Sequence, residues 1–305
     1  MAHPELYHAT SLATRRLTLH PTKIRHRRLD SAAFQPHGSG VTTPLFDPLA
    51  QRLWKLAETA PTALREVYVV RTKDAPRFDS AGRGPSRVHR HAVPTTVVCL
   101  AGVVRVLTAR GPHDLRPGAM AVFAPAAWHA QAPLRSDAAM YTQGLIFGKS
   151  DIIYYTADRA IYTLIPAQPS ERMLHAIIAA DDPERQLKLG SDLLKLVATT
   201  AANEVHVPQA IWKMGQRLWH NLDQSPRAEQ ILAAAGLSQR QALRIFRAWF
   251  GTGPKRVLRE QQLLLAAALL RDGVSVDTVI AETGFPDRRS FNRAWRLAHG
   301  TPPKR

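Results

Sequence analysis

The chain has 305 residues, of which 45% are hydrophobic, and a formal net charge of +17. This length suits two domains of ordinary size, and the hydrophobic fraction excludes wholesale disorder. A single cysteine, Cys99, excludes an internal disulfide and favours a reducing compartment. The first residues have no apolar signal core, and the longest apolar run, 263–270, is too short for a membrane span. We therefore expect a cytoplasmic protein without a membrane partner.

The positive charge is concentrated in two segments. Residues 206–305 contain 16 lysines and arginines against 7 acidic residues, and residues 1–44 contain 6 against 2. Strongly basic chains often bind phosphate groups, which points to a nucleic acid as partner. A basic but merely solvated surface would give the same total charge.

The first 150 residues divide into a basic arm and a β-rich segment. Residues 1–60 form the arm, with KIRHRR at 23–28, and end in a short helix predicted at about 45–60. The arm suits a flexible DNA contact, a solvated tail or a cover for a ligand pocket. Residues 61–150 contain short runs such as TTVVCLAGVVRVL, separated by glycine and proline, which is typical of a sandwich or small barrel.

The remaining residues are predicted to be helical. We assign 151–205 to a helical linker and dimerisation region, and 206–305 to a separate all-helical domain. An apolar stripe in the first of these suits either dimerisation or packing against the β-rich domain, and it comprises Met173, Leu174, Ile177 and Ile178. The predicted fold class is α+β, with an N-terminal β-barrel or jelly roll, flanking helices and a C-terminal all-α domain.

Three histidines in the β-rich segment form a candidate metal or ligand site. His89 and His91 alternate along a predicted strand and so point to one side, and His129 follows in a later motif. His89, His91 and Gly102, followed by LRPGAMAVFAPAAWHA, resemble the two motifs of cupin barrels, with Thr95 where cupins usually have a glutamate. Three imidazoles can bind one Zn²⁺ or Fe²⁺ ion and leave an open position. The alternative is a metal-free pocket whose histidines bind a small molecule or fill space.

A repeat is the main feature of residues 206–305. SQRQALRIFRAWFGTGPKR at 238–256 matches DRRSFNRAWRLAHGTPPKR at 287–305 at eight of nineteen positions. Each copy begins with a residue typical of helix N-caps, Ser238 or Asp287. At 100° per residue, each predicted helix has one apolar face and one arginine-bearing face. The arginines are Arg240, Arg244 and Arg247 in the first copy, and Arg289, Arg293 and Arg296 in the second.

A shorter helix precedes each copy. SPRAEQILAAAG at 225–236 has Ser225 as its predicted cap, and SVDTVIAETG at 275–284 has Ser275. A short helix, a turn with glycine and a capped helix form a helix-turn-helix unit, whose second helix lies in the DNA major groove. An arginine there can bond guanine in a fork, whereas arginines further along the helix suit phosphates. Base contacts are predicted for Arg240, Arg244, Arg289 and Arg293, and phosphate contacts for Arg247 and Arg296.

This double unit resembles the AraC/XylS family of transcription regulators. About 100 residues carry the resemblance, including Gly251, Pro254, Gly300 and Pro303, and Gln262 departs from it where the family usually has a linker-helix arginine. The resemblance implies a C-terminal double helix-turn-helix and an N-terminal sensor domain that is cupin-like here. It places these residues near the bases: Gln239, Arg240, Leu243, Arg244, Arg288, Arg289, Ser290, Asn292 and Arg293.

The segment between the two copies, PKRVLREQQLLLAAALLRDG, is apolar over most of its circumference at 263–270. We expect this linker helix to be covered on several sides, chiefly by the two helix-turn-helix units.

These features predict a ligand-responsive, sequence-specific regulator of transcription rather than an enzyme. The expected partners are double-stranded DNA, a small-molecule or metal effector and a second copy of the chain. Effector binding would shift the population of conformations that the DNA-binding domain adopts. The alternatives are a metal-dependent cupin enzyme with an appended DNA-binding domain and a non-specific architectural DNA binder.

Overall fold

The computed structural model describes residues 64–72, 88–108, 110–134, 139–146, 149–156, 160–165, 168–200 and 208–303. The predicted basic arm, the predicted helix at 45–60 and the predicted boundary near residue 205 lie outside these ranges. All of the described residues belong to the compact unit Phe46–Arg305.

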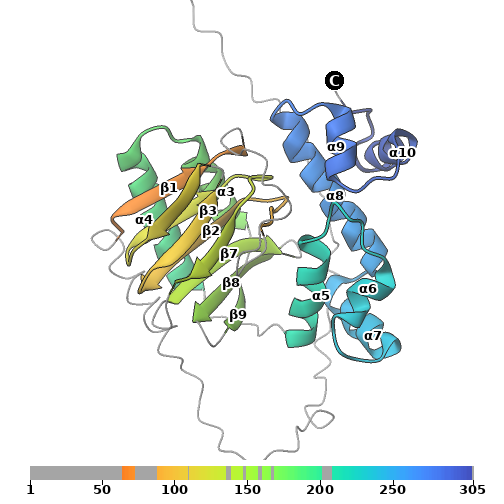
Figure 1. Cartoon of the computed structure of the whole chain (residues 1–305), viewed down its shortest axis with the longest axis horizontal. Helices are drawn as coiled ribbons and strands as arrows, with labels where there is room; N and C mark the ends of the chain where they lie inside the picture. The colour runs from red at the N-terminus through yellow and green to blue at the C-terminus, as the bar shows by residue number, and fades with distance from the viewer. Residues whose placement is uncertain are drawn as a thin grey trace, which may run out of the picture. The chain divides into compact units, whose positions relative to one another are not determined.

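The N-terminal half of the described chain forms two β-sheets (Figure 1). The larger sheet has the strand order β1-β5-β2-β7-β8-β9, with β1 parallel to β5 and the other pairs antiparallel. The smaller sheet has the antiparallel order β4-β3-β6. The strands are β1 (Glu66–Val70), β2 (Thr95–Ala101), β3 (Val104–Thr108), β4 (Gly111–Leu115), β5 (Ala119–Phe123), β6 (Ala130–Pro133), β7 (Ala139–Ile146), β8 (Lys149–Thr156) and β9 (Ala160–Ile165).

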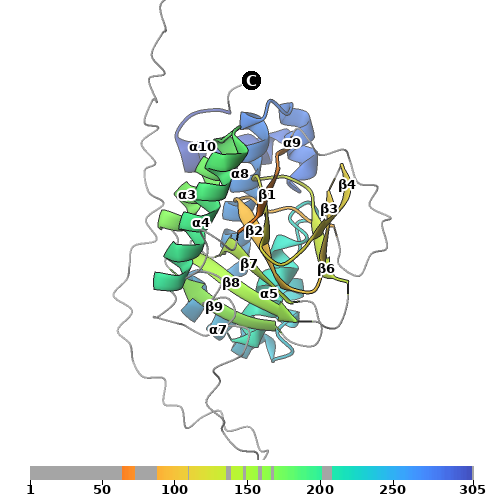
Figure 2. The same ribbon diagram turned by 90° about the vertical axis from the view of Figure 1, so that its left-hand side faces the viewer.

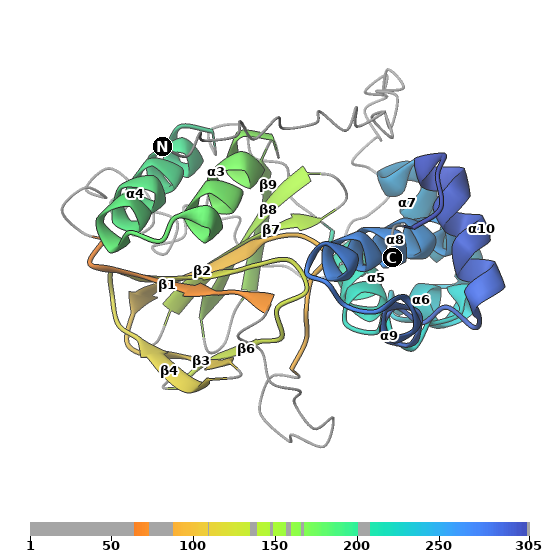
Figure 3. The same ribbon diagram turned by 90° about the horizontal axis from the view of Figure 1, so that it is seen from above.

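Strand β5 is buried along its whole length because both of its faces are covered. Ala121 and Phe123 point to one side and pack with Val104 and Leu115 of the smaller sheet. The residues that alternate with them, Met120 and Val122, belong to a second core with side chains of α3 (Gln168–Ala179) and α4 (Pro183–Thr200). Figures 2 and 3 show these helices on one face of the larger sheet and strands β3, β4 and β6 on the other.

The α+β fold class is confirmed, but one predicted boundary is wrong. Residues 151–165 were assigned to the helical linker, whereas 151–156 and 160–165 belong to strands β8 and β9. These stretches, DIIYYT and AIYTLI, are rich in β-branched and aromatic residues, and they extend the larger sheet because β8 pairs with β7 and β9 pairs with β8. The apolar stripe of α3 packs against the sheet through Leu174 and Ile177, as the core-packing alternative predicts.

The C-terminal half of the described chain is helical and shares one core. Its helices are α5 (Gln209–Trp219), α6 (Ala228–Ala233), α7 (Gln239–Phe250), α8 (Pro254–Arg271), α9 (Val276–Glu282) and α10 (Arg288–His299). Glycines 251 and 300 end α7 and α10 in the left-handed conformation, with φ of 71° and 73°. This equivalence explains why the sequence repeats glycine at these two places.

Helix α8 is the linker helix, and it is covered on several sides as predicted. Leu263, Leu265, Ala266 and Leu269 are all buried in the shared core, whereas Leu264 is 44% exposed. Gln262 is also buried, and its side-chain N–H donates to the carbonyl of Leu222 at 3.2 Å. No helix in the part of the chain that the structure describes is both long enough and apolar enough to cross a membrane.

Candidate functional site

Helices α6 and α7 form the first helix-turn-helix unit. The turn between them contains Gly236 at a φ of +67°, and Ser238 caps α7 by accepting the backbone N–H of Gln241 at 3.4 Å. The predicted cap of α6 is wrong, because α6 starts only at Ala228 and Arg227 is its N-cap. The Gln230 side chain accepts the backbone N–H of Arg227 at 2.8 Å, which fixes the start of the helix beyond Ser225.

Helices α9 and α10 form the second unit in the same way. Ser275 caps α9 as predicted, and Asp287 caps α10 by accepting the backbone N–H of Ser290 at 2.6 Å. This bond and a second one from the Ser290 hydroxyl hold the pKa of Asp287 below its usual value. A charged carboxylate at a helix N-terminus is favoured by the helix dipole, so the cap stabilises the start of α10.

Both second helices bury an apolar face and expose an arginine face. In α7 the buried residues include Phe246 and Phe250, whose rings stack at 4.0 Å. In α10 they are Phe291 and Trp295. The exposed residues among the predicted DNA contacts are Gln239, Arg240, Arg244, Arg247, Arg288, Arg289, Arg293 and Arg296.

Three predicted base contacts are only half-buried, namely Leu243, Ser290 and Asn292. Leu243 packs against the shared core, and the Ser290 hydroxyl donates to Asp287 at 3.0 Å. These two side chains therefore already take part in packing and capping. Arg288 forms an ion pair with Asp277 at 3.4 Å, with both side chains largely exposed.

The three predicted histidines lie together in the sheet domain. His89 and His129 form an isolated antiparallel bridge, with backbone N–H to carbonyl distances of 2.8 and 2.9 Å. The ring centroid of His89 lies 4.8 Å from that of His91 and 4.6 Å from that of His129. One nitrogen of each of the three residues lies within 4.8 Å of the others, so this constellation can hold a metal ion.

Burial sets the protonation state of this cluster. It is the main cause that holds the pKa of His91 and of His129 well below the usual value, and the neighbouring imidazoles lower both further. Both rings are therefore neutral at physiological pH, which is the form that binds a metal. The His129 ring also lies flat on Phe123, at 3.9 Å between centroids, and its Nδ1 is 2.9 Å from the carbonyl of Ala127.

A fourth imidazole, that of His220, joins the cluster from the helical domain. His220 follows the last residue of α5, where its backbone N–H bonds to the carbonyl of Gln216. Its ring centroid lies 4.6 Å from that of His89 and 6.3 Å from that of His91.

Arg90, between the two histidines, reaches the second helix-turn-helix unit. Its Nη1 donates to Oε2 of Glu282 at 2.6 Å, and its Nη2 donates to the backbone carbonyl of Glu282 at 2.7 Å. The guanidinium carbon also lies 4.4 Å from the ring centroid of Trp128. The Arg90 side chain is only 5% exposed, so this is a buried ion pair.

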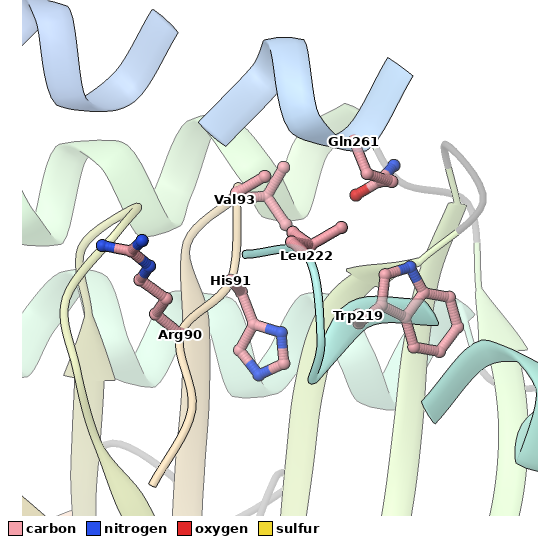
Figure 4. Close-up of a pocket in the computed structure, with 7 residues that line it drawn as sticks. Arg90, His91, Val93, Trp219, Leu222 and Gln261 are labelled. Carbon is pink, nitrogen blue, oxygen red and sulfur yellow. The ribbon is translucent and has the colours of Figure 1, made fainter. Parts of the chain in front are cut away.

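Two small cavities border the histidines. One is lined by residues that include His91, Trp219 and Gln261, and Figure 4 shows Arg90 and His91 pointing in different directions beside it. The other is lined by residues that include His89 and His220. Each has a volume of about 10 Å³, which is about the space of a single water molecule. In this conformation an ion fits beside the imidazoles, whereas an organic effector needs rearrangement.

A family model described as a helix-turn-helix domain matches residues 231–305. The match begins within α6 and spans α7, the linker helix and the second unit, and the two capped helices occupy equivalent places in the fold. The C-terminal part of the chain is therefore a helix-turn-helix domain.

Solved structures of ToxT from Vibrio cholerae resemble this chain only distantly. One, at 1.65 Å resolution, is 7% identical, covers 71% of this chain and 91% of that chain, and gives a TM-score of 0.35. ToxT of strain SCE256 with a bound unsaturated fatty acid is 9% identical, with 75% and 90% covered and a TM-score of 0.34.

The sequence pointed to every exposed arginine of α7 and α10 but not to His220, Arg90 or Glu282. The arginines follow from helical periodicity within each repeat, which is a local signal. His220 is 131 positions from His89 in the sequence, and no motif in the sequence connects the two. Only the folding of the sheet domain against the helical domain brings them together.

Proposed function

We propose that the regulator binds a specific DNA sequence by placing α7 and α10 in successive major grooves, and that an effector at the histidine cluster alters this binding. The proposed DNA binding is supported by the pair of equivalent capped helices, each of which has an exposed row of arginines and a buried aromatic face. A chance surface would not present the same row twice. Two grooves on one face of DNA are about 34 Å apart, which sets the expected spacing of the half-sites.

Within each row, position along the helix suggests the role. Arg240, Arg244, Arg289 and Arg293 lie in the first half of their helices, which is the part that faces base edges in such units. Their guanidinium groups match the two acceptors of guanine. Arg247 and Arg296 lie in the last turn and suit phosphates, which position the protein without reading sequence.

The effector site of this proposal is the cluster of His89, His91 and His129. It lies next to Arg90, whose ion pair with Glu282 links the sheet domain to the second helix-turn-helix unit. An effector that binds one arrangement of these groups better than another would shift the population of DNA-binding conformations. We retain a homodimer as part of the proposal, although the apolar stripe of α3 is used within the chain.

Footprinting of genomic DNA fragments, followed by affinity measurements on the protected duplex, tests the DNA-binding part. Arg244→Ala and Arg293→Ala should each weaken binding by about 1–3 kcal/mol and relax the preference at one base position. Arg172→Ala, an exposed arginine of α3 in the sheet domain, is the matched control and should leave binding unchanged. Unchanged affinity and footprint in both recognition-helix variants would refute the assignment of these residues.

The convergence of three histidines also favours a second function, that of a metal-dependent enzyme. The paired arginine helices have no role in such catalysis, so the regulatory function is the better supported one. Metal-dependent turnover that disappears in His91→Ala would support the enzyme instead. Operator binding by protein stripped of metal, without turnover when metal is restored, would remove it.

A further inference from the structure

Four histidines from two distant parts of the chain meet beside the second helix-turn-helix unit. His89, His91 and His129 come from the sheet domain, and His220 comes from the end of α5 in the helical domain. The centroid distances between pairs of these rings are 4.6 Å for His89–His129 and for His89–His220, 4.8 Å for His89–His91, 5.4 Å for His91–His129 and 6.3 Å for His91–His220.

These distances match a tetrahedral metal site. With metal–nitrogen bonds of about 2.1 Å and ring centroids roughly 1.2 Å behind the ligating nitrogens, the centroids of four imidazoles lie about 5.4 Å apart. The observed distances fall around this value, and only the His91–His220 pair is clearly wider. Small rotations of these two rings would therefore bring four nitrogens onto one ion.

The chemistry of the rings also suits a metal. The Nδ1–H of His129 is directed at the carbonyl of Ala127, which leaves Nε2 as the ligand atom and fixes the ring orientation. Imidazole donors select Zn²⁺ and related transition metals over Mg²⁺ or Ca²⁺, which prefer oxygen.

We propose that His89, His91, His129 and His220 bind one divalent ion of the Zn²⁺ class, and that this ion joins the sheet domain to the DNA-binding domain. The inference rests on the proposed function, because it gives the effector site a ligand class and a fourth ligand. His220 is the residue that distinguishes it from a three-histidine site confined to the sheet domain.

The segment that follows His220 explains how the ion would affect DNA binding. The carbonyl of Leu222 accepts the Gln262 side chain of the linker helix at 3.2 Å. Gly284, in the turn of the second unit, lies so close to Leu222 and Asp223 that a Cβ there would be 2.5 Å from the Leu222 carbonyl oxygen. His220 is thus two residues from a tight junction with both the linker and the second unit.

Arg90 supplies a second connection on the other side of the cluster. It lies between His89 and His91, and its guanidinium holds both the side chain and the backbone carbonyl of Glu282 at the end of α9. Fixing the two histidines on an ion therefore also fixes the residue that holds α9. Filling the site should change the freedom of α10 relative to α7, and with it the DNA affinity.

Zinc binding to the full chain tests the site. Protein stripped by a chelator is titrated with Zn²⁺ against a competing metal indicator, and bound zinc is counted by elemental analysis. We expect one ion per chain in the wild type. Zinc should bind at least about tenfold more weakly to His220→Ala, because losing even a residue that only hydrogen-bonds to a metal ligand typically lowers metal affinity 10–100-fold. His175→Ala, a half-exposed histidine of α3, is the control and should bind like the wild type. No saturable binding, or a His220→Ala variant equal to the wild type, would overturn the proposal.

A second variant tests directly whether residue 220 contacts the metal, and it keeps the proposal testable if His220→Ala fails to fold. The variant His220→Cys keeps a metal ligand at this position, because thiolate and imidazole both bind Zn²⁺ and Co²⁺. With Co²⁺ it should show a thiolate-to-cobalt charge-transfer absorption that the wild type lacks. A folded His220→Cys protein that binds Co²⁺ without this absorption would exclude residue 220 from the metal.

The coupling is tested with the duplex that footprinting identifies. Zinc should change the DNA affinity of the wild type at least about fivefold, in line with the usual size of coupling between sites. Glu282→Gln should bind zinc as tightly as the wild type while its DNA affinity responds less than about twofold. An equal response in both proteins, or none in the wild type, would defeat the coupling. A retained footprint without any zinc effect would still leave the proposed DNA binding intact, whereas absence of a footprint would refute that function instead.

Discussion

Replacing Glu282 by alanine leaves the Arg90 guanidinium buried without its carboxylate partner. Breaking a buried pair from one side costs about 3–5 kcal/mol when the remaining charge is fully enclosed. The Arg90 side chain is 5% exposed, but Glu282 is 33% exposed, so some water reaches the vacated position. The bond to the Glu282 backbone carbonyl and the contact with Trp128 also remain. We therefore expect a loss of about 1.5–3 kcal/mol, the range of a single hydrogen bond to a charged group.

Urea denaturation followed by tryptophan fluorescence measures this loss as a shift in the transition of the helical domain. Glu260→Ala is the matched control, because Glu260 pairs with the exposed Arg256 on α8 at 3.1 Å. An exposed pair of this kind contributes about 0.3–0.5 kcal/mol. The double variant Arg90→Met/Glu282→Met should recover most of the stability, since it leaves no buried charge. Equal losses in Glu282→Ala and Glu260→Ala would refute the reasoning that the Arg90 pair is buried and joins the two domains.

Two further predictions concern the helix-turn-helix units. Gly284→Ala should destabilise the protein by more than about 2 kcal/mol, because a Cβ at this left-handed residue would also clash with the carbonyls of Leu222 and Asp223. Gly251→Ala should cost only the strain of a left-handed residue, about 1–2 kcal/mol, because a Cβ there would meet no other atom within 4 Å. Thermal unfolding compares the two, and equal losses would mean that the junction at Gly284 is loose. Asp287→Ala should remove the α10 cap and lower the denaturant midpoint, whereas Asp287→Asn should keep most of the cap, and denaturation curves of the two variants measure the difference.

The local structure of the helical domain could be predicted in detail from the sequence. Ser238, Ser275 and Asp287 precede amphipathic helices, and each caps its helix as their chemistry predicts. Ser225 fails as a cap because the Gln230 side chain takes the backbone N–H of Arg227 and moves the helix start. Capping depends on bonds within about four residues, so most of it is visible in the sequence, and the exceptions come from competing neighbours.

Residues 151–165 show where local patterns are insufficient. The helical patterns of α3 and α4 follow directly after this stretch, so it is predicted to be helical as well. Its β-branched and aromatic residues instead form strands, of which β8 pairs with β7. Whether such a stretch becomes a strand depends on a partner strand, which its own residues do not specify.

The sequence by itself determined the two capped arginine helices, the covered linker helix and the helix-turn-helix class of the C-terminal domain, because helical periodicity, caps and glycine ends act within a few residues. Only the tertiary structure decided that His220 joins His89, His91 and His129, and that Arg90 bonds to Glu282 across 192 residues of chain. Contacts of this kind form when two domains pack together, and the residues that meet come from distant parts of the sequence that share no local pattern. The histidine pattern therefore suggested a site in one domain, and the fold extended it to the helix-turn-helix domain.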